Sequence, residues 1–284
     1  MKVILSRKGF DSSYGGVASP ILDDGTLLSL PIPSPSRITY DELSVGGIPL
    51  GKVVADLTSG RIPSNHHAHL DPDLNAAMYP RLPGWRPIFG QVDAAQAHLE
   101  GCGVTIGDIF LFFGWFREVN TVGEQYRFVR DARNLHVIYG WLQVGEIIRV
   151  NQKPSCAPQW ASEYHPHFYG DRGANNTVYI ASERLDIGGI ASSADGGGVF
   201  RKFHEDLCLT APGAKNRSQW LLPMWFYPRD KRAPLSYHSN PQRWKMHEDC
   251  TILDSVARGQ EFVLDTDHYP EATSWMHDLM SHAS

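Results

Sequence analysis

The chain has 284 residues, 42% of them hydrophobic and 20% charged, which provides for a substantial core and excludes an intrinsically disordered protein. The net charge of -5 at pH 7 argues against a protein that binds long nucleic acid through a broad cationic face. Neutralising many phosphates requires many lysines and arginines. Any contact with nucleic acid is therefore expected to be local. Strand-rich domains often reach this length undivided, so we expect one domain over residues 1–284.

The first expected element is a buried strand at residues 3–5, an apolar run that ends before a glycine-containing turn. Residues 7–13 emerge from the end of this strand, where functional loops are common. The apolar run is too short for a secretory signal or a membrane span, so we expect a cytoplasmic protein with no membrane partner. The four cysteines lie far apart, which is typical of reduced thiols.

The rest of the N-terminal third is dense in glycine, proline and serine, and we expect strands and ordered loops there. Residues 91–100 show helical spacing, with Gly101 and Gly103 as the stop signals. Two apolar runs, 106–116 and 137–150, are typical of buried strands. Gly140 and Gly145 interrupt the second run, which indicates a bulge, a sharp bend or a close backbone approach. A short strand at 177–181 and a helix at about 271–280 complete the elements.

These elements predict an α+β, β-rich fold: a mixed small barrel with elaborations and a few short helices. The barrel core is expected at about residues 91–185.

Three segments carry a resemblance to a known family: 5–16 (LSRKGFDSSYGG), 107–117 (GDIFLFFGWFR) and 235–241 (LSYHSNP). Together they look like the third nucleotide modification associated domain family, over essentially the whole chain. Members of that family are grouped because their genes occur together with nucleic-acid modification and phage-conflict systems. The resemblance therefore implies a context of nucleic-acid modification or phage defence. It supplies no established catalytic residues to carry over.

A second resemblance concerns the centre of the chain. Segment 104–108 (VTIGD) before an apolar strand, followed by 138–144 (IYGWLQV), is similar to the PUA-like barrels, including the EVE and ASCH groups. Those barrels hold a flipped or modified base, so the resemblance implies a base pocket with Trp115 or Trp141 as the stacking residue. The insert at 118–136 is short, and no motif identifies the base-reading positions.

The loop at residues 7–13 combines two cations, a carboxylate and two hydroxyls beside a glycine. Such a loop can clamp phosphate, because arginine binds oxyanions bidentately and exposed backbone N–H groups add to the binding. Arg7, Lys8 and Asp11 are candidates for phosphate contact or proton transfer, with Ser12 and Ser13 as ligand-binding residues. The spacing of a P-loop or dinucleotide site is absent. The alternative is a plain turn in which Asp11 hydrogen-bonds its own backbone.

Segment 65–73 (NHHAHLDPD) is rich in histidine. Alternate residues of an extended segment point the same way, so His67 and His69 could share a divalent metal with Asp71. His165 and His167 repeat the spacing and could complete the shell. The alternative is a loop whose histidines only form hydrogen bonds, one of them as a general base. The sequence identifies no other cofactor.

Segment 237–244 (YHSNPQRW) mixes imidazole, amide, guanidinium and indole groups that can hold a nucleotide. His238 is a candidate catalytic residue, and Asn240 and Arg243 are candidate binding residues. A loop packed by its own aromatic residues is the alternative.

The leading hypothesis is a protein that binds a modified base or nucleotide, free or within nucleic acid, with processing of that group left open. Two enzyme hypotheses compete with it: a transferase or hydrolase of a free nucleotide or nucleotide-sugar, and a metal-dependent nuclease or hydrolase. The sequence leaves open the type of modification, the choice among DNA, RNA and mononucleotide, and the oligomeric state.

Overall fold

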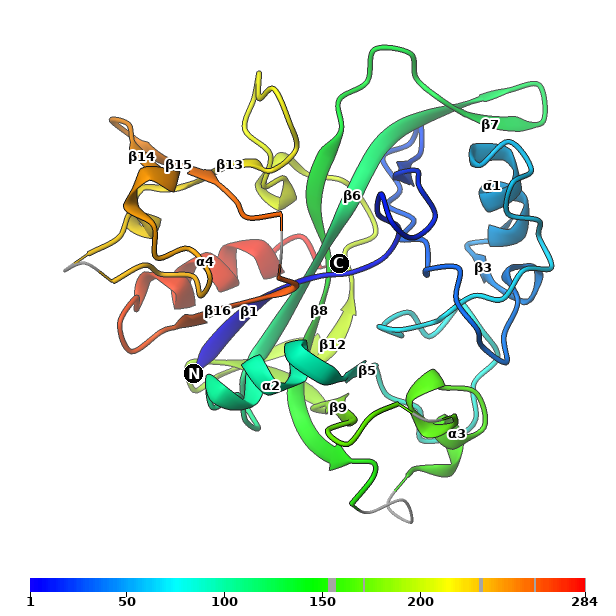
Figure 1. Cartoon of the computed structure of the whole chain (residues 1–284), viewed down its shortest axis with the longest axis horizontal. Helices are drawn as coiled ribbons and strands as arrows, with labels where there is room; N and C mark the ends of the chain where they lie inside the picture. Colours follow the sequence, from blue (N-terminus) through cyan, green and yellow to red (C-terminus); the bar gives the residue numbers. More distant parts are fainter. Residues whose placement is uncertain (153–156, 171, 230–231, 258, 284) are drawn as a thin grey trace.

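The computed structural model describes residues 1–152, 157–170, 172–229, 232–257 and 259–283. A mixed sheet with the order β16-β1-β6-β8-β9-β5 forms its centre (Figure 1). These strands are β1 (Lys2–Arg7), β5 (Ile88–Gln91), β6 (Ile109–Val122), β8 (Leu135–Arg149), β9 (Thr177–Ala181) and β16 (Glu261–Asp265). β1 runs parallel to β6 and antiparallel to β16, so the end of β1 opens beside the middle of β6.

Shorter strands extend this centre or form small sheets of their own. β2 (Ser19–Ile21) and β7 (Gln125–Phe128) pair with β6, and β12 (Gly197–Val199) pairs with β8. β3 (Ser44–Val45) pairs with β4 (Ile48–Pro49), and β10 (Arg184–Ile187) with β11 (Ile190–Asp195). β13 (Gln219–Pro223), β15 (Cys250–Asp254) and β14 (Trp244–Met246) form a three-stranded sheet.

The helices are few and short. They are α1 (Leu50–Leu57), α2 (Asp93–Gly101), α3 (Gln159–Ser162), α4 (Glu271–Met280) and the 3₁₀ helices η1 (Tyr40–Glu42), η3 (Pro166–Phe168), η4 (Glu205–Leu207), η5 (Met224–Phe226) and η6 (Pro241–Arg243). The predicted β-rich α+β fold is therefore confirmed. No sheet in the described ranges closes into a barrel, so the small PUA-like barrel expected near 91–185 is not confirmed.

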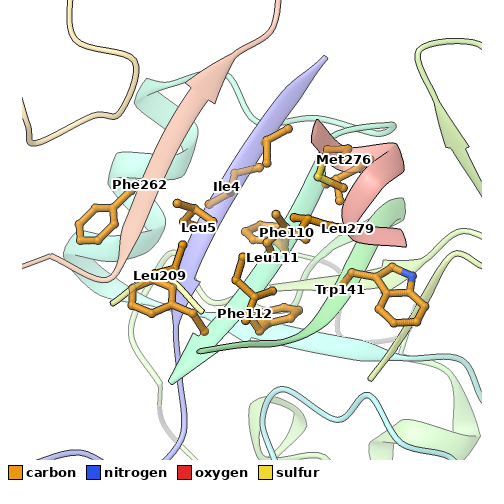
Figure 2. Close-up of a cluster of buried hydrophobic side chains, with 14 of the residues drawn as sticks. Ile4, Leu5, Phe110, Leu111, Phe112, Trp141, Leu209, Phe262, Met276 and Leu279 are labelled. Atoms are coloured by element: carbon orange, nitrogen blue, oxygen red, sulfur yellow. The ribbon is translucent and has the colours of Figure 1, made fainter. Parts of the chain in front are cut away.

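The first eight residues of β6, 109–116, are buried or nearly so on both faces, as their apolar sequence predicts. Its side chains alternate between the faces of the sheet. Phe110 and Phe112 pack against Phe89, at centroid distances of 5.1 and 5.2 Å, whereas Phe113 packs against Trp220 at 5.2 Å. Figure 2 shows this core, which also takes in Met276 and Leu279 from α4.

The two glycines of β8 mark bulges and close backbone approaches, as predicted. The pairing with β6 shifts register next to Gly140, and the pairing with β9 shifts around Gly145. A Cβ at Gly140 would lie 2.6 Å from Leu74, and one at Gly145 would lie 2.6 Å from the backbone of Ser182. Only glycine fits where the chains approach so closely.

The predicted helices near 91–100 and 271–280 correspond to α2 and α4, and the strand at 177–181 to β9. The expectation that the N-terminal third lacks helices was wrong, because α1 forms there. Its apolar residues recur at helical spacing and pack in a second core with Phe10 and Tyr40; they are Leu50, Val53, Val54 and Leu57.

The described cysteines, Cys102, Cys208 and Cys250, are free thiols, and Cys156 lies outside the described residues. Among the described residues, no helix has the length and apolar character needed to cross a membrane.

Candidate functional site

Two adjacent chambers open on either side of the loop that follows β1. Both are lined by Arg7, Lys8, Gly9, Asp11 and Gln260. We call the first, of about 240 Å³, the Arg7 chamber, and the second, of about 170 Å³, the His69 chamber. The loop predicted from sequence as a functional site thus forms the wall between two cavities.

The loop is held in place by its own sequence. Gly9 has a positive φ of 84°, which turns the chain away from β1 at a position that disfavours a side chain. The Phe10 ring is buried in the second core. Asp11 Oδ1 accepts hydrogen bonds from the backbone N–H groups of Ser13 (2.7 Å) and Tyr14 (2.6 Å). The turn expected as the structural alternative is therefore present, and Asp11 still lines both chambers.

The Arg7 chamber brings together residues from distant parts of the chain. Trp115 on β6 and His136 on β8 are direct cross-strand partners, and both line the chamber. Arg217 comes from the segment before β13 and stacks its guanidinium over Trp115 at 4.3 Å. Ser12 and Ser13 complete the polar wall.

The cations of this chamber are poorly compensated. Within the described residues, the Arg7 side chain donates to two backbone carbonyls, those of Ala257 (3.0 Å) and Gly259, and to no carboxylate; burial lowers its pKa from the usual value. Burial also lowers the pKa of Arg217, whose guanidinium makes no hydrogen bond or ion pair to any described residue. Lys8, in contrast, is paired with the buried carboxylate of Glu261 at 2.9 Å. The chamber therefore favours a bound anion.

His136 is held in one tautomer. The indole N–H of Trp220 can only donate, and it lies 3.0 Å from His136 Nδ1, so Nδ1 accepts. Burial, together with Arg217 and Arg7, holds the pKa of His136 well below its usual value. His136 is thus a neutral imidazole whose proton is on Nε2, a hydrogen-bond donor rather than a base.

The His69 chamber contains the second group of chemical interest. His69 pairs with Ile32 through its backbone N–H, and Asp71 follows it in the chain. His167 lies on η3, across from Gly90 of β5. Ligand atoms of His69, Asp71 and His167 all lie within 4.8 Å of one another. The structure therefore joins His69 and Asp71 to His167, whereas His67 is exposed and outside this cluster.

The carboxylate of Asp71 is held on both sides, and its side chain is only 7% exposed. Oδ1 accepts the N–H of Gly90 (2.8 Å) and lies 3.4 Å from His165 Nε2, and Oδ2 lies 3.4 Å from His167 Nε2. Burial by itself would raise the pKa of Asp71, but the two histidines outweigh burial and hold it well below the usual value. Burial lowers the pKa of His69 to about 4, so its imidazole is neutral at pH 7.

The remaining predicted residues line neither of the two chambers. Trp141 is 4% exposed, packs against Phe200 and donates its indole N–H to the carbonyl of Asp195. His238 is fully buried against Phe262, and burial lowers its pKa to about 4.

Asn240 and Arg243 belong to the same segment as His238. Asn240 caps η6 by accepting the N–H of Gln242 (3.0 Å), and Arg243 donates to the carbonyl of Asp254 (2.8 Å). Each side chain therefore has a structural contact.

Sequence reasoning did not identify Arg217, His136 or Arg172 as site residues. His136 is the second residue of an apolar strand, where an imidazole is unusual, and this was the one available signal. Arg217 and Arg172 lie in polar loops, whose sequences resemble any solvated turn.

The family model for nucleotide modification associated domain 3 matches residues 2–265, which is nearly the whole chain. No curated protein and no solved structure matched the chain. Both chambers are lined entirely by residues within the matched range. The chain belongs to the nucleotide modification associated domain 3 family.

Proposed function

We propose that this protein binds a nucleotide, free or as one unit of a nucleic acid, with its phosphate in the Arg7 chamber. The observation that carries the proposal is the charge of that chamber, which is lined by three cations, Arg7, Lys8 and Arg217, and by one carboxylate, Asp11. Lys8 is paired with Glu261, so the excess positive charge comes from Arg7 and Arg217. Family membership supports a nucleotide context. The net acidic charge of the chain supports a ligand of one or a few nucleotides over a long duplex.

Arg217 gives the most direct evidence that the ligand carries a phosphate. A half-buried guanidinium without a partner loses hydration and gains no protein acceptor in return. A phosphate accepts two parallel N–H groups from arginine, which would compensate Arg217. A larger hollow of about 630 Å³ near the C-terminus is lined by several carboxylates, including Asp206 and Asp249, and would repel the same ligand.

The other groups that line the Arg7 chamber suit a nucleotide as well. The hydroxyls of Ser12 and Ser13 can donate to phosphate oxygens. Trp115 provides an aromatic surface for a base, and Arg217 already covers part of that ring. The proposal gives no ligand contact to Trp141, His238, Asn240 or Arg243, because each has a structural contact elsewhere.

An enzyme acting on the bound nucleotide is the second candidate function, and His136 favours it. A neutral imidazole fixed as a donor can stabilise negative charge that develops on a reacting oxygen. In this version the protein is a transferase or hydrolase of a nucleotide or nucleotide-sugar. A noncatalytic reader of modified nucleotides would use the same phosphate contacts without turnover.

The test compares binding of a mononucleotide, its nucleoside and inorganic phosphate by calorimetry. We expect the mononucleotide to bind more tightly than the nucleoside. Replacing Arg217 by Leu removes a charge-assisted hydrogen bond of about 1.5–3 kcal/mol, so affinity should fall about 10- to 100-fold. Lys215→Leu is the matched control, because it removes a nearby exposed charge outside the chamber.

Equal affinity for nucleotide and nucleoside, or an Arg217→Leu variant that binds like the parent, would refute the phosphate site. Product formation from a free nucleotide that is lost in His136→Phe would establish the enzyme. Binding without turnover of any tested nucleotide or modified oligonucleotide would favour the reader.

A further inference from the structure

The orientation of His167 points to a cation beside it. Its Nδ1 lies 2.6 Å from Asn176 Oδ1, while Asn176 Nδ2 donates to the backbone carbonyl of His167 at 2.8 Å. The second contact fixes the amide, because only the NH₂ group can donate to a carbonyl. Asn176 therefore presents its oxygen, so Nδ1 of His167 carries the proton. In the neutral ring the lone pair is then on Nε2.

That lone pair faces another acceptor. His167 Nε2 lies 3.4 Å from Asp71 Oδ2, in a place where both side chains are almost fully buried. Two acceptors at this separation repel each other unless a positive charge lies close to both. Either a proton on Nε2 or a metal ion would remove the repulsion.

The position of His69 favours a metal ion over a proton as the positive charge beside His167 and Asp71. A proton between His167 and Asp71 needs no third group, yet His69 reaches the same point. The His69 residue is 7% exposed, its Nδ1 is fully buried without a hydrogen bond, and its ring bonds to no described residue. A buried imidazole normally has a partner, and a metal ion would supply one.

We propose that His69, Asp71 and His167 bind one divalent transition-metal ion of the zinc or iron(II) type. Two imidazoles and one carboxylate suit these metals, whereas magnesium and calcium prefer oxygen ligands throughout. The bond from His167 to Asn176 and that from Gly90 to Asp71 are the outer contacts that orient metal ligands.

Three protein ligands leave a coordination position open, as in catalytic rather than structural sites. That position faces the His69 chamber, which Arg172 also lines with a buried Nε that has no hydrogen-bond partner in the part of the chain that the structure describes. An oxyanion is the class of ligand that can bind a metal ion and a guanidinium together. The metal site does not depend on the proposed nucleotide site, since its three ligands line the His69 chamber and none of them lines the Arg7 chamber.

The experiment uses the full chain, freed of metal by a chelator and titrated without nucleotide. Zinc(II) is followed by calorimetry, cobalt(II) by its visible absorption, and excess magnesium(II) serves as a competitor. His69→Asn removes one ligand and breaks no hydrogen bond. The matched control is His204→Asn, in an exposed group formed by His204, Asp206 and His282.

We expect one zinc ion per chain, no competition from magnesium, and the same zinc affinity in His204→Asn. His69→Asn should weaken zinc binding by about 100-fold or more, because losing only an outer contact of a metal ligand costs about 10- to 100-fold. Its thermal unfolding in chelator should match that of the parent, which separates a lost ligand from a lost fold. Asp71→Asn keeps an acceptor for Gly90 and should weaken zinc binding as well.

The proposal is overturned if the parent binds no zinc, if magnesium competes on equal terms, or if zinc binding is lost in His204→Asn and kept in His69→Asn. Nucleotide affinity plays no part in these results, so the two proposals can fail separately.

Discussion

Replacing Gly90 by alanine tests how closely β5 must approach His167. A Cβ at Gly90 would lie 2.2 Å from His167 Cδ2 and 2.5 Å from Nε2, whereas ordinary contacts span 3.4–4 Å. The ring would have to retreat by more than about 1 Å, the difference between those distances. That shift would break its 2.6 Å contact with Asn176 and move Nε2 away from Asp71.

The expected cost follows from these two contacts. Overpacking of a buried site costs about 1–3 kcal/mol, and a buried polar pair that loses its hydrogen bond adds a similar amount if the ring does move. Together these costs should lower the free energy of unfolding by about 2–6 kcal/mol, and zinc affinity should fall by at least about tenfold. Urea denaturation measures the first quantity, and titration of the metal-free chain measures the second.

Gly101→Ala is the matched control for Gly90→Ala. A Cβ at Gly101 meets nothing within 4 Å, and its φ is not positive, so this change should be neutral or slightly stabilising. If Gly90→Ala leaves both the free energy of unfolding and zinc affinity at the parent's values, His167 is not held as the structure describes, and the argument for its orientation fails.

Two further predictions concern stability. Asp73→Ala should lower the free energy of unfolding by about 3–5 kcal/mol in urea denaturation, because Asp73 is fully buried and its removal leaves Arg81 without a counter-ion; a loss below about 1 kcal/mol would contradict this. His238 is neutral in the folded protein, with a pKa lowered by burial from 6.5 to about 4, so the unfolded chain binds more protons between these values. The contribution of the neutral His238 imidazole to the free energy of unfolding is fully present above pH 6.5. It is lost as the pH falls towards 4, by up to about 3 kcal/mol. His238→Gln should therefore show a flatter decline in the free energy of unfolding over that range, and parallel curves for variant and parent would disprove the assignment.

The sequence by itself determined four strands of the central sheet, β1, β6, β8 and β9, and the helices α2 and α4. β1, β9 and α4 were predicted because apolar periodicity and glycine or proline signals act over a few residues. The bulges at Gly140 and Gly145 were predictable for the same reason, since a glycine within a strand of β formers indicates a local irregularity. Helix α1, which was not predicted, also has apolar residues at helical spacing. The glycine and proline residues around it favoured strands and loops in the prediction.

The tertiary structure alone decided which side chains share a cavity. The loop at 7–13 was identifiable from its chemistry, yet its partner Arg217 comes from the distant segment just before β13. His69, Asp71 and His167 were all candidates from the sequence, but only the structure joins His167 to the pair and leaves His67 outside it. Trp141 and His238 had the right chemistry but are enclosed by Phe200 and Phe262.

The physical reason is the range of the interactions involved. Backbone conformation responds to neighbours a few residues away, which one sequence contains. Whether an arginine or histidine faces a cavity, a counter-ion or the core depends on contacts between segments that only the packed sheet brings together. For this protein the sequence therefore identified four central strands, two helices and the loop that both chambers share, and the packing of the central sheet assembled the two chambers.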